Sequence, residues 1–120
     1  MIVAALDIMQ LKDFSQLAQE LDLDILLEIH SEEELTGALS ISPTLVGINN
    51  RDLTTFEVDK NLSLKLSKKI SRDITVVSES GINSKEDILS SKEQGIHSFL
   101  IGESLMREPS PGEALKKILD

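Results

Sequence analysis

The sequence predicts an α/β fold in which short parallel strands alternate with helices. Apolar runs of strand length recur along the chain without polar alternation inside them, as expected for strands that a parallel sheet buries on both faces. Polar stretches of helical length separate these runs, so the strand centres fall about 20 to 30 residues apart, the period of a β-α unit. No two runs are joined by a hairpin signal, which favours parallel strands over antiparallel ones.

Five strands are expected, each a nearly unbroken apolar run: Ile2–Leu6, Ile25–Ile29, Leu45–Ile48, Ile74–Val77 and Phe99–Ile101. A helix is expected after each strand, and its start is marked by capping residues or prolines: Asp7 with Gln10, Ser31 with Glu34, Asp59, Ser84 with Asp87, and Pro109 and Pro111 before Glu113–Leu119. The first helix keeps helical spacing as far as Leu21, and the second extends to about Leu39. Gly95 ends the fourth helix, as C-terminal glycines commonly do.

The number of units and the length of the chain together predict part of a barrel. Periodicity alone fits both an open doubly wound sheet and part of a closed (β/α)8 barrel. A complete barrel takes about 250 residues, whereas this chain has 120. If the strands belong to a barrel, residues 1–120 form one domain that makes up only part of it.

Composition argues against several classes of function. A net charge of −9 and a pI of about 4.6 disfavour a nucleic-acid partner, which needs a basic surface. The chain has no cysteine, tryptophan or tyrosine, which removes thiol chemistry and leaves little surface for stacking on bases. No apolar run approaches the roughly 18 residues of a membrane span, and Met1–Leu6 lacks the basic leader of a signal peptide. We therefore expect a cytoplasmic protein that binds neither nucleic acid nor membrane.

Candidate functional residues lie at the carboxyl ends of the expected strands, where parallel α/β proteins gather their functional groups. Glu28 lies among apolar neighbours, where a carboxylate can act as a general base or acid. The alternative is a structural carboxylate paired with a lysine or arginine. Glu79 would project near Glu28 if their strands face a common interior. His30, beside the Ser31 cap, is expected to have a loop or capping role.

Two amides and two charged residues follow the third strand. Asn49 and Asn50 either hold a polar group of a substrate or simply form the turn. Arg51 and Asp52 could bind an anion, but a local ion pair that shapes the loop is the favoured interpretation.

The ends of the fourth and fifth strands resemble a phosphate cradle. Ser80 and Gly81 offer a hydroxyl and an accessible amide, and Gly102, Glu103 and Ser104 close the fifth strand similarly. Barrels often place a phosphate site after their last two strands, where backbone amides face the anion. The sequence has no metal-binding or nucleotide-binding motif, so we expect neither a metal nor a cofactor.

Several segments together resemble the indole-3-glycerol-phosphate synthase family of tryptophan biosynthesis: Ile2–Leu6, Leu26–His30 with Glu32–Leu35, Gly47–Leu53, Val77–Ile82 and Phe99–Met106. The resemblance implies a lyase with a phosphate-binding TIM barrel fold. Its sugar-phosphate substrate, 1-(2-carboxyphenylamino)-1-deoxyribulose 5-phosphate, would lose carbon dioxide and water as an indole ring closes.

The resemblance also implies roles for individual residues. Glu28 corresponds to the catalytic glutamate that accepts a proton, while Asn49 and Glu79 correspond to polar residues that contact the substrate. The phosphate would be held by Ser80, Gly81, Gly102 and the amide of Glu103. A carboxylate beside a phosphate is unfavourable unless it points away, so the Glu103 side chain is expected to turn aside.

The resemblance places residues 1–120 at barrel strands four to eight. In this family, strand one supplies a glutamate and a lysine, and strand three supplies the general-acid lysine. These strands would lie outside the chain, and the chain alone is expected to be inactive. Two alternatives remain open. The first is a half-barrel that associates with itself or with the missing N-terminal part without catalysis. The second is another phosphate-binding barrel enzyme, such as a sugar-phosphate isomerase.

Overall fold

The computed structural model describes all 120 residues and is built around a four-stranded parallel sheet. The strands are hydrogen-bonded in chain order: β1 (Leu27–Ile29), β2 (Leu45–Asn49), β3 (Thr75–Glu79) and β4 (Ser98–Leu100). The helices are α1 (Ile8–Glu20), α2 (Glu32–Leu39), α3 (Asn61–Ser67), α4 (Lys85–Glu93), α5 (Glu103–Met106) and α6 (Pro111–Leu119), with a short 3-10 helix, η1 (Val3–Ala5). This alternation confirms the predicted α/β class and has the architecture of a partial (β/α)8 barrel.

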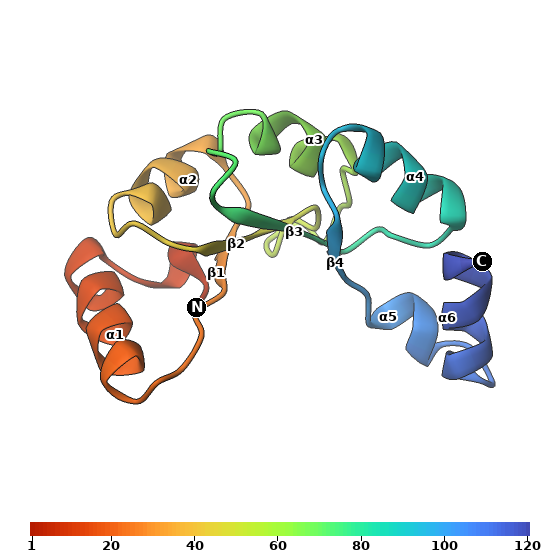
Figure 1. Cartoon of the computed structure of the whole chain (residues 1–120), viewed down its shortest axis with the longest axis horizontal. Coiled ribbons are helices and arrows are strands. Elements are labelled where there is room, and N and C mark those ends of the chain that lie inside the picture. Colours follow the sequence, from red (N-terminus) through yellow and green to blue (C-terminus); the bar gives the residue numbers. More distant parts are fainter.

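The elements form an open arch (Figure 1). Helices α2, α3 and α4 follow the convex side of the sheet, and α1 and α6 lie at the two ends of the arch. The concave side carries no helix along the strands. Helices therefore cover only the convex face of the sheet, and the concave face is left uncovered along the strands. No helix is both long enough and apolar enough to cross a membrane.

The prediction of a strand at Ile2–Leu6 is wrong, and the sheet has four strands rather than five. Only Ile2 makes a parallel bridge, to Glu28, and the Glu28 amide donates to Met1 O at 2.8 Å. The backbone then turns into η1, with the Leu6 amide donating to Val3 O at 3.1 Å. A short apolar run is compatible with a strand or a helix. Here the turn is favoured because it buries Val3 in the core.

The helix caps predicted from local sequence are largely present. Asp7 and Gln10 form a reciprocal capping box at α1, and so do Ser84 and Asp87 at α4. Ser31 caps α2, but the Glu34 carboxylate accepts from the amide of His30 rather than from that of the cap. The cap expected at Asp59 is wrong, because α3 begins at Asn61 after Lys60, although the Asp59 carboxylate accepts from the Asn61 amide. In addition, α6 already begins at Pro111, and α5 was not expected.

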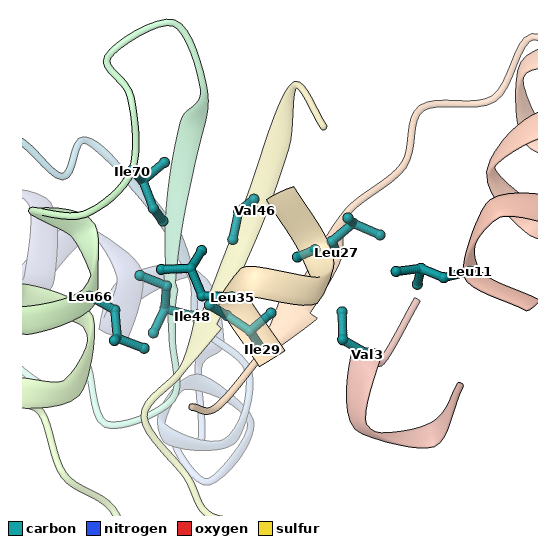
Figure 2. Close-up of a cluster of buried hydrophobic side chains, with 10 residues drawn as sticks. Val3, Leu11, Leu27, Ile29, Leu35, Val46, Ile48, Leu66 and Ile70 are labelled. Carbon is teal, nitrogen blue, oxygen red and sulfur yellow. The ribbon is translucent and has the colours of Figure 1, made fainter. Parts of the chain in front are cut away.

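The core lies between the sheet and its helices. Alternate residues of a strand face opposite sides of a sheet, and the alternate set Leu27, Ile29, Val46 and Ile48 is buried against α2 and α3. Figure 2 shows Ile29 and Ile48 gathered with Leu35 of α2 and Leu66 of α3. The residues in between face the concave side. We call this concave side of the four strands the inner face.

Candidate active site at the carboxyl ends of the strands

Glu28, Asn49 and Glu79 come together on the inner face from three neighbouring strands. The register pairs Asn49 with Glu79, and Glu28 lies one strand away. Asn49 Nδ2 donates to Glu28 Oε1 at 2.8 Å, while Asn49 Oδ1 accepts from the amide of Arg51 at 3.0 Å. Asn49 thus shapes the turn, as one interpretation of its sequence position expected, and it also orients the Glu28 carboxylate. Its contact with a polar group of a substrate stays a prediction.

Glu28 is half-buried and forms no ion pair with a lysine or arginine side chain. Within residues 1–120, Glu28 therefore has no structural partner of this kind. The neutral amide of Asn49 is its hydrogen-bond partner, which leaves the negative charge of Glu28 uncompensated. A carboxylate held in place but not neutralised is suited to accepting a proton.

Glu79 is the most unusual side chain of the inner face. It is only 3% exposed, and its Oε1 is sealed from solvent without a hydrogen-bond partner. Burial, and secondarily the charge of Glu28, raise the pKa of Glu79 to about 7. Such a carboxyl can hold or release a proton near neutral pH. Perturbed carboxyl groups of this kind cluster at functional sites.

Gly47 provides the space that Glu79 occupies. A Cβ atom at this position would lie 2.9 Å from Glu79 Cδ and would collide with Oε1. Any side chain at Gly47 would therefore push the carboxylate out of its position. The sequence identifies Gly47 only as a glycine near a strand end, and the register with β3 explains why it must be small.

The four residues of the proposed phosphate cradle, Ser80, Gly81, Gly102 and Glu103, line one pocket of about 800 Å³. Ser80 and Gly81 both have positive φ, 62° and 78°, which directs their backbone away from the β3 ladder. The N–H groups of all four residues donate to no other group of the chain. The Ser104 hydroxyl donates to Ile82 O at 3.2 Å and so ties the two strand ends together. Glu28, Asn49 and Glu79 do not line this pocket, although Glu79 directly precedes Ser80.

The local pair expected between Arg51 and Asp52 is wrong. Arg51 Nη2 instead reaches Glu103 Oε2 at 2.5 Å, across 52 positions of sequence. Asp52 accepts from the amides of Thr54 and Thr55, and these hydrogen bonds lower the pKa of its carboxyl. His30 lies in the loop after β1, where its Nδ1 is 2.6 Å from Asn49 O and its Nε2 is 3.7 Å from Asp52.

Asn50 is completely buried, whereas Asn49 keeps 7% of its surface exposed. Its Nδ2 donates to Ser78 Oγ at 3.2 Å and to Ser80 O at 3.1 Å. Its Oδ1 accepts from the amide of Ser63 at 3.0 Å. Asn50 thus clamps the ends of β2 and β3 to the start of α3, and it holds the turn that presents Ser80 and Gly81.

Sequence reasoning missed several contributors to this region. Ser63 and Ser78 complete the Asn50 clamp, and their hydroxyls lie 3.1 Å apart. The signal that could have revealed Ser78 is a small polar residue in the apolar run of β3, on the face that packs against helices. Lys60 and Lys117 line the same pocket as Ser80 and Gly81, and nothing in their local sequence distinguishes them from surface lysines.

Glu79 should give the chain a distinctive dependence of stability on pH. Its carboxyl titrates near 4.5 when unfolded and near 7 when folded, so between these values the folded state binds more protons. The free energy of unfolding should therefore fall as pH rises through this window, by about 3 kcal/mol at most. In Glu79→Gln that fall should vanish. Urea unfolding at about pH 5 and about pH 8 measures it. Glu93→Gln, an exposed change in α4, serves as the control; equal slopes in all three proteins would contradict the assignment.

Asn50→Ala should be strongly destabilising. The substitution leaves the Ser63 amide and the Ser80 carbonyl without their partners, and the resulting loss in the free energy of unfolding should be about 2 to 4 kcal/mol. Asn61→Ala, at an exposed position that begins α3, should change it by less than about 0.5 kcal/mol. A loss at Asn50 as small as that at Asn61 would show that the clamp is not needed.

Comparisons with solved structures support the fold. A chain of the Amycolatopsis orientalis BexX/CysO complex superimposes with a TM-score of 0.62 at 18% identity, covering 94% of this chain and 50% of that one. A mandelate oxidase crystallised with benzoyl-formic acid gives a TM-score of 0.59 at 20% identity, covering 82% of this chain and 31% of that one. At these identities the likeness concerns the fold alone.

Comparisons of sequence are more specific. The chain is 49% identical over 119 residues to an indole-3-glycerol phosphate synthase of Legionella pneumophila (strain Paris), covering 99% of this chain and 46% of the relative. It is 47% identical to the enzyme of that name from Delftia acidovorans (strain DSM 14801 / SPH-1), covering 98% of this chain and 44% of the relative. The chain thus spans about half the length of the curated relatives it matches. The model of the indole-3-glycerol phosphate synthase family matches residues 1–118, and the chain belongs to this family.

Proposed function

We propose that the chain supplies the proton-accepting and phosphate-binding side of an indole-3-glycerol-phosphate synthase site. The proposed substrate is 1-(2-carboxyphenylamino)-1-deoxyribulose 5-phosphate, and the proposed reaction is a decarboxylating, dehydrating ring closure. The observation that carries the proposal is the convergence of Glu28, Asn49 and Glu79 on the inner face, directly before the turn that opens the pocket with unused amides. Family membership supplies the reaction that these groups would serve.

The two carboxyl groups are suited to different parts of this reaction. Glu28 is oriented by Asn49 and not neutralised, so we assign it the role of proton acceptor. Glu79 is buried without a partner and has a pKa of about 7, so it can exchange a proton near neutral pH. Closing the ring also needs an acid that polarises the ketone, because a base alone leaves this step largely uncatalysed.

That acid is not found among the strand residues of the inner face. The alternate residues on this side of β1 to β4 include two carboxylates and an amide, but no lysine or arginine. Lys60, in the neighbouring pocket, is held by Asp87 at 2.7 Å. We therefore propose that the chain on its own binds the substrate without turning it over at an enzymatic rate. Deleting one such acid costs on the order of a hundredfold in rate.

The phosphate is assigned to the amides of Ser80, Gly81, Gly102 and Glu103. The support is that these N–H groups have no partner within the chain and line one pocket. Lys60, Lys117 and two arginines add positive charge to the same lining. Backbone amides that face an open space together with basic side chains form a common type of anion site.

Binding can be measured directly, because the chain has neither tryptophan nor tyrosine and the arylamino group of the substrate would fluoresce without background. Gly81→Ala should weaken binding by more than about tenfold. At φ +78° a new Cβ is strained and would also lie 2.7 Å from Val58 Cγ1, which would displace the turn. Gly95→Ala is the matched control, since φ there is +87° but nothing lies within 4 Å.

The titration tests both the phosphate assignment and the proposed lack of an acid. Gly95→Ala should share the backbone strain, about 1 kcal/mol of stability, and bind like the original chain. Equal binding by both variants would refute the phosphate assignment. Steady formation of the indole product by the chain alone would refute the proposal that the acid is lacking. If a ribulose phosphate without the aromatic ring binds as tightly as the arylated substrate, another phosphate-binding barrel activity is favoured.

A second candidate function is assembly without catalysis. Large apolar side chains are exposed at both ends of the arch, including Phe14 and Leu17 in α1, Leu21 directly after it, and Leu119 in α6. The outer edge of β4 is open, whereas that of β1 is partly covered by Met1 and Ile2, and an open edge favours pairing with another chain. If this candidate is correct, the mass measured by light scattering should rise with concentration toward that of a dimer. Leu17→Glu and Leu21→Glu together should abolish the rise, and a monomer mass at every concentration would rule the candidate out.

A further inference from the structure

The carboxylate of Glu103 holds two arginine side chains at the edge of the phosphate pocket. Glu103 Oε2 lies 2.5 Å from Arg51 Nη2, and Glu103 Oε1 lies 2.7 Å from Arg107 Nη2. All three residues line the pocket with Gly81 and Gly102. The carboxylate turns toward the arginines, yet it remains part of the pocket wall. The carboxylate was expected to turn aside from a phosphate. It does turn toward the arginines, but it does not leave the pocket.

These contacts neutralise much of the positive charge that an entering anion would meet. Four basic side chains line the pocket, and two of them are engaged by Glu103. Lys60 is engaged by Asp87. Lys117 forms no ion pair within the chain, and neither does the other acidic residue of the lining, Glu108. Whether the two arginines are free to bind an anion thus depends on the single carboxylate of Glu103.

Arg51 is built so that it can exchange partners without leaving the pocket. Its Nη1 donates to Phe56 O at 3.2 Å, while Nη2 is the atom that contacts Glu103. A guanidinium group has several donors in one plane and binds carboxylates and phosphates with the same geometry. If Nη2 is released, the bond to Phe56 still keeps the guanidinium in place. Glu103 is 54% exposed, so its freed carboxylate can move into solvent at little cost.

We propose that Glu103 is an internal competitor for the phosphate group and sets the affinity of the pocket for phosphate monoesters. In the empty pocket the carboxylate occupies Arg51 and Arg107. A phosphate dianion on the amides of Gly81 and Gly102 displaces it and takes over the released donor of Arg51. Glu103 thereby weakens the binding of any anion that cannot replace it as a ligand of the arginine. This inference rests on the proposed phosphate site and deepens it.

The test compares Glu103→Gln with Glu108→Gln by titrating each protein with inorganic phosphate at low ionic strength. Both substitutions remove one negative charge from the lining, but only the first frees the arginines. Binding is followed through the amide NMR signals of Gly81 and Gly102. Glu103→Gln should bind phosphate about five- to tenfold more tightly than the original chain, and Glu108→Gln less than about twofold more tightly. Glu103→Ser, with a shorter neutral side chain, should behave like Glu103→Gln.

The outcomes separate this inference from the proposed function. If phosphate moves the Gly81 and Gly102 signals in the original chain but Glu103→Gln binds it no more tightly, the site stands and the competitor role is refuted. If Glu103→Gln and Glu108→Gln tighten binding equally, the effect is one of net charge, and the inference is again refuted. If phosphate moves these signals in none of the proteins, both the site and the inference fail.

Discussion

The buried side chain of Asn50 is the constraint on which the geometry of the site depends. It joins the ends of β2 and β3 to the start of α3 through hydrogen bonds to three polar groups of the chain: Ser78 Oγ, Ser80 O and the amide of Ser63. The backbone N–H of Asn50 donates to Glu79 O at 2.8 Å, and its backbone carbonyl accepts from the amide of Asp59 at 2.9 Å. The residue before it orients Glu28, and the residue after it reaches Glu103. A fully satisfied buried amide is costly to disrupt, so it fixes all of these neighbours at once.

The two faces of the sheet carry different kinds of side chain, because alternate residues of each strand point to opposite faces. Toward the helices the strands present leucine, isoleucine and valine, which form the core. Toward the inner face they present Glu28, Asn49 and Glu79, together with the glycine that makes room for the third of these. Uncompensated polar groups such as the Glu79 carboxyl are typical of functional sites.

Much of the fold could be predicted because its signals are local. The capping boxes at Asp7 and Ser84 need only four consecutive residues, and the apolar runs of β2 and β3 lie between polar stretches that mark where the strands end. The first run, Ile2–Leu6, was mispredicted because its choice between strand and turn depends on what Val3 packs against. The partner of Arg51 could not be predicted, since Glu103 is brought to it by the order of the strands. For the same reason, the roles of Asn49 and Asn50 could not be told apart from sequence.

The central claim is that the polar inner face and the phosphate pocket form one site, although they are lined by different residues. The most direct measurement is an NMR titration with the arylamino-deoxyribulose phosphate that follows the carboxyl carbons of Glu28 and Glu79 and the amides of Gly81 and Gly102. One site predicts that all four signals move together, with the same half-saturating concentration. Movement of the glycine amides while both carboxyl carbons stay unchanged would contradict the claim, because the pocket would then bind phosphate independently of the inner face.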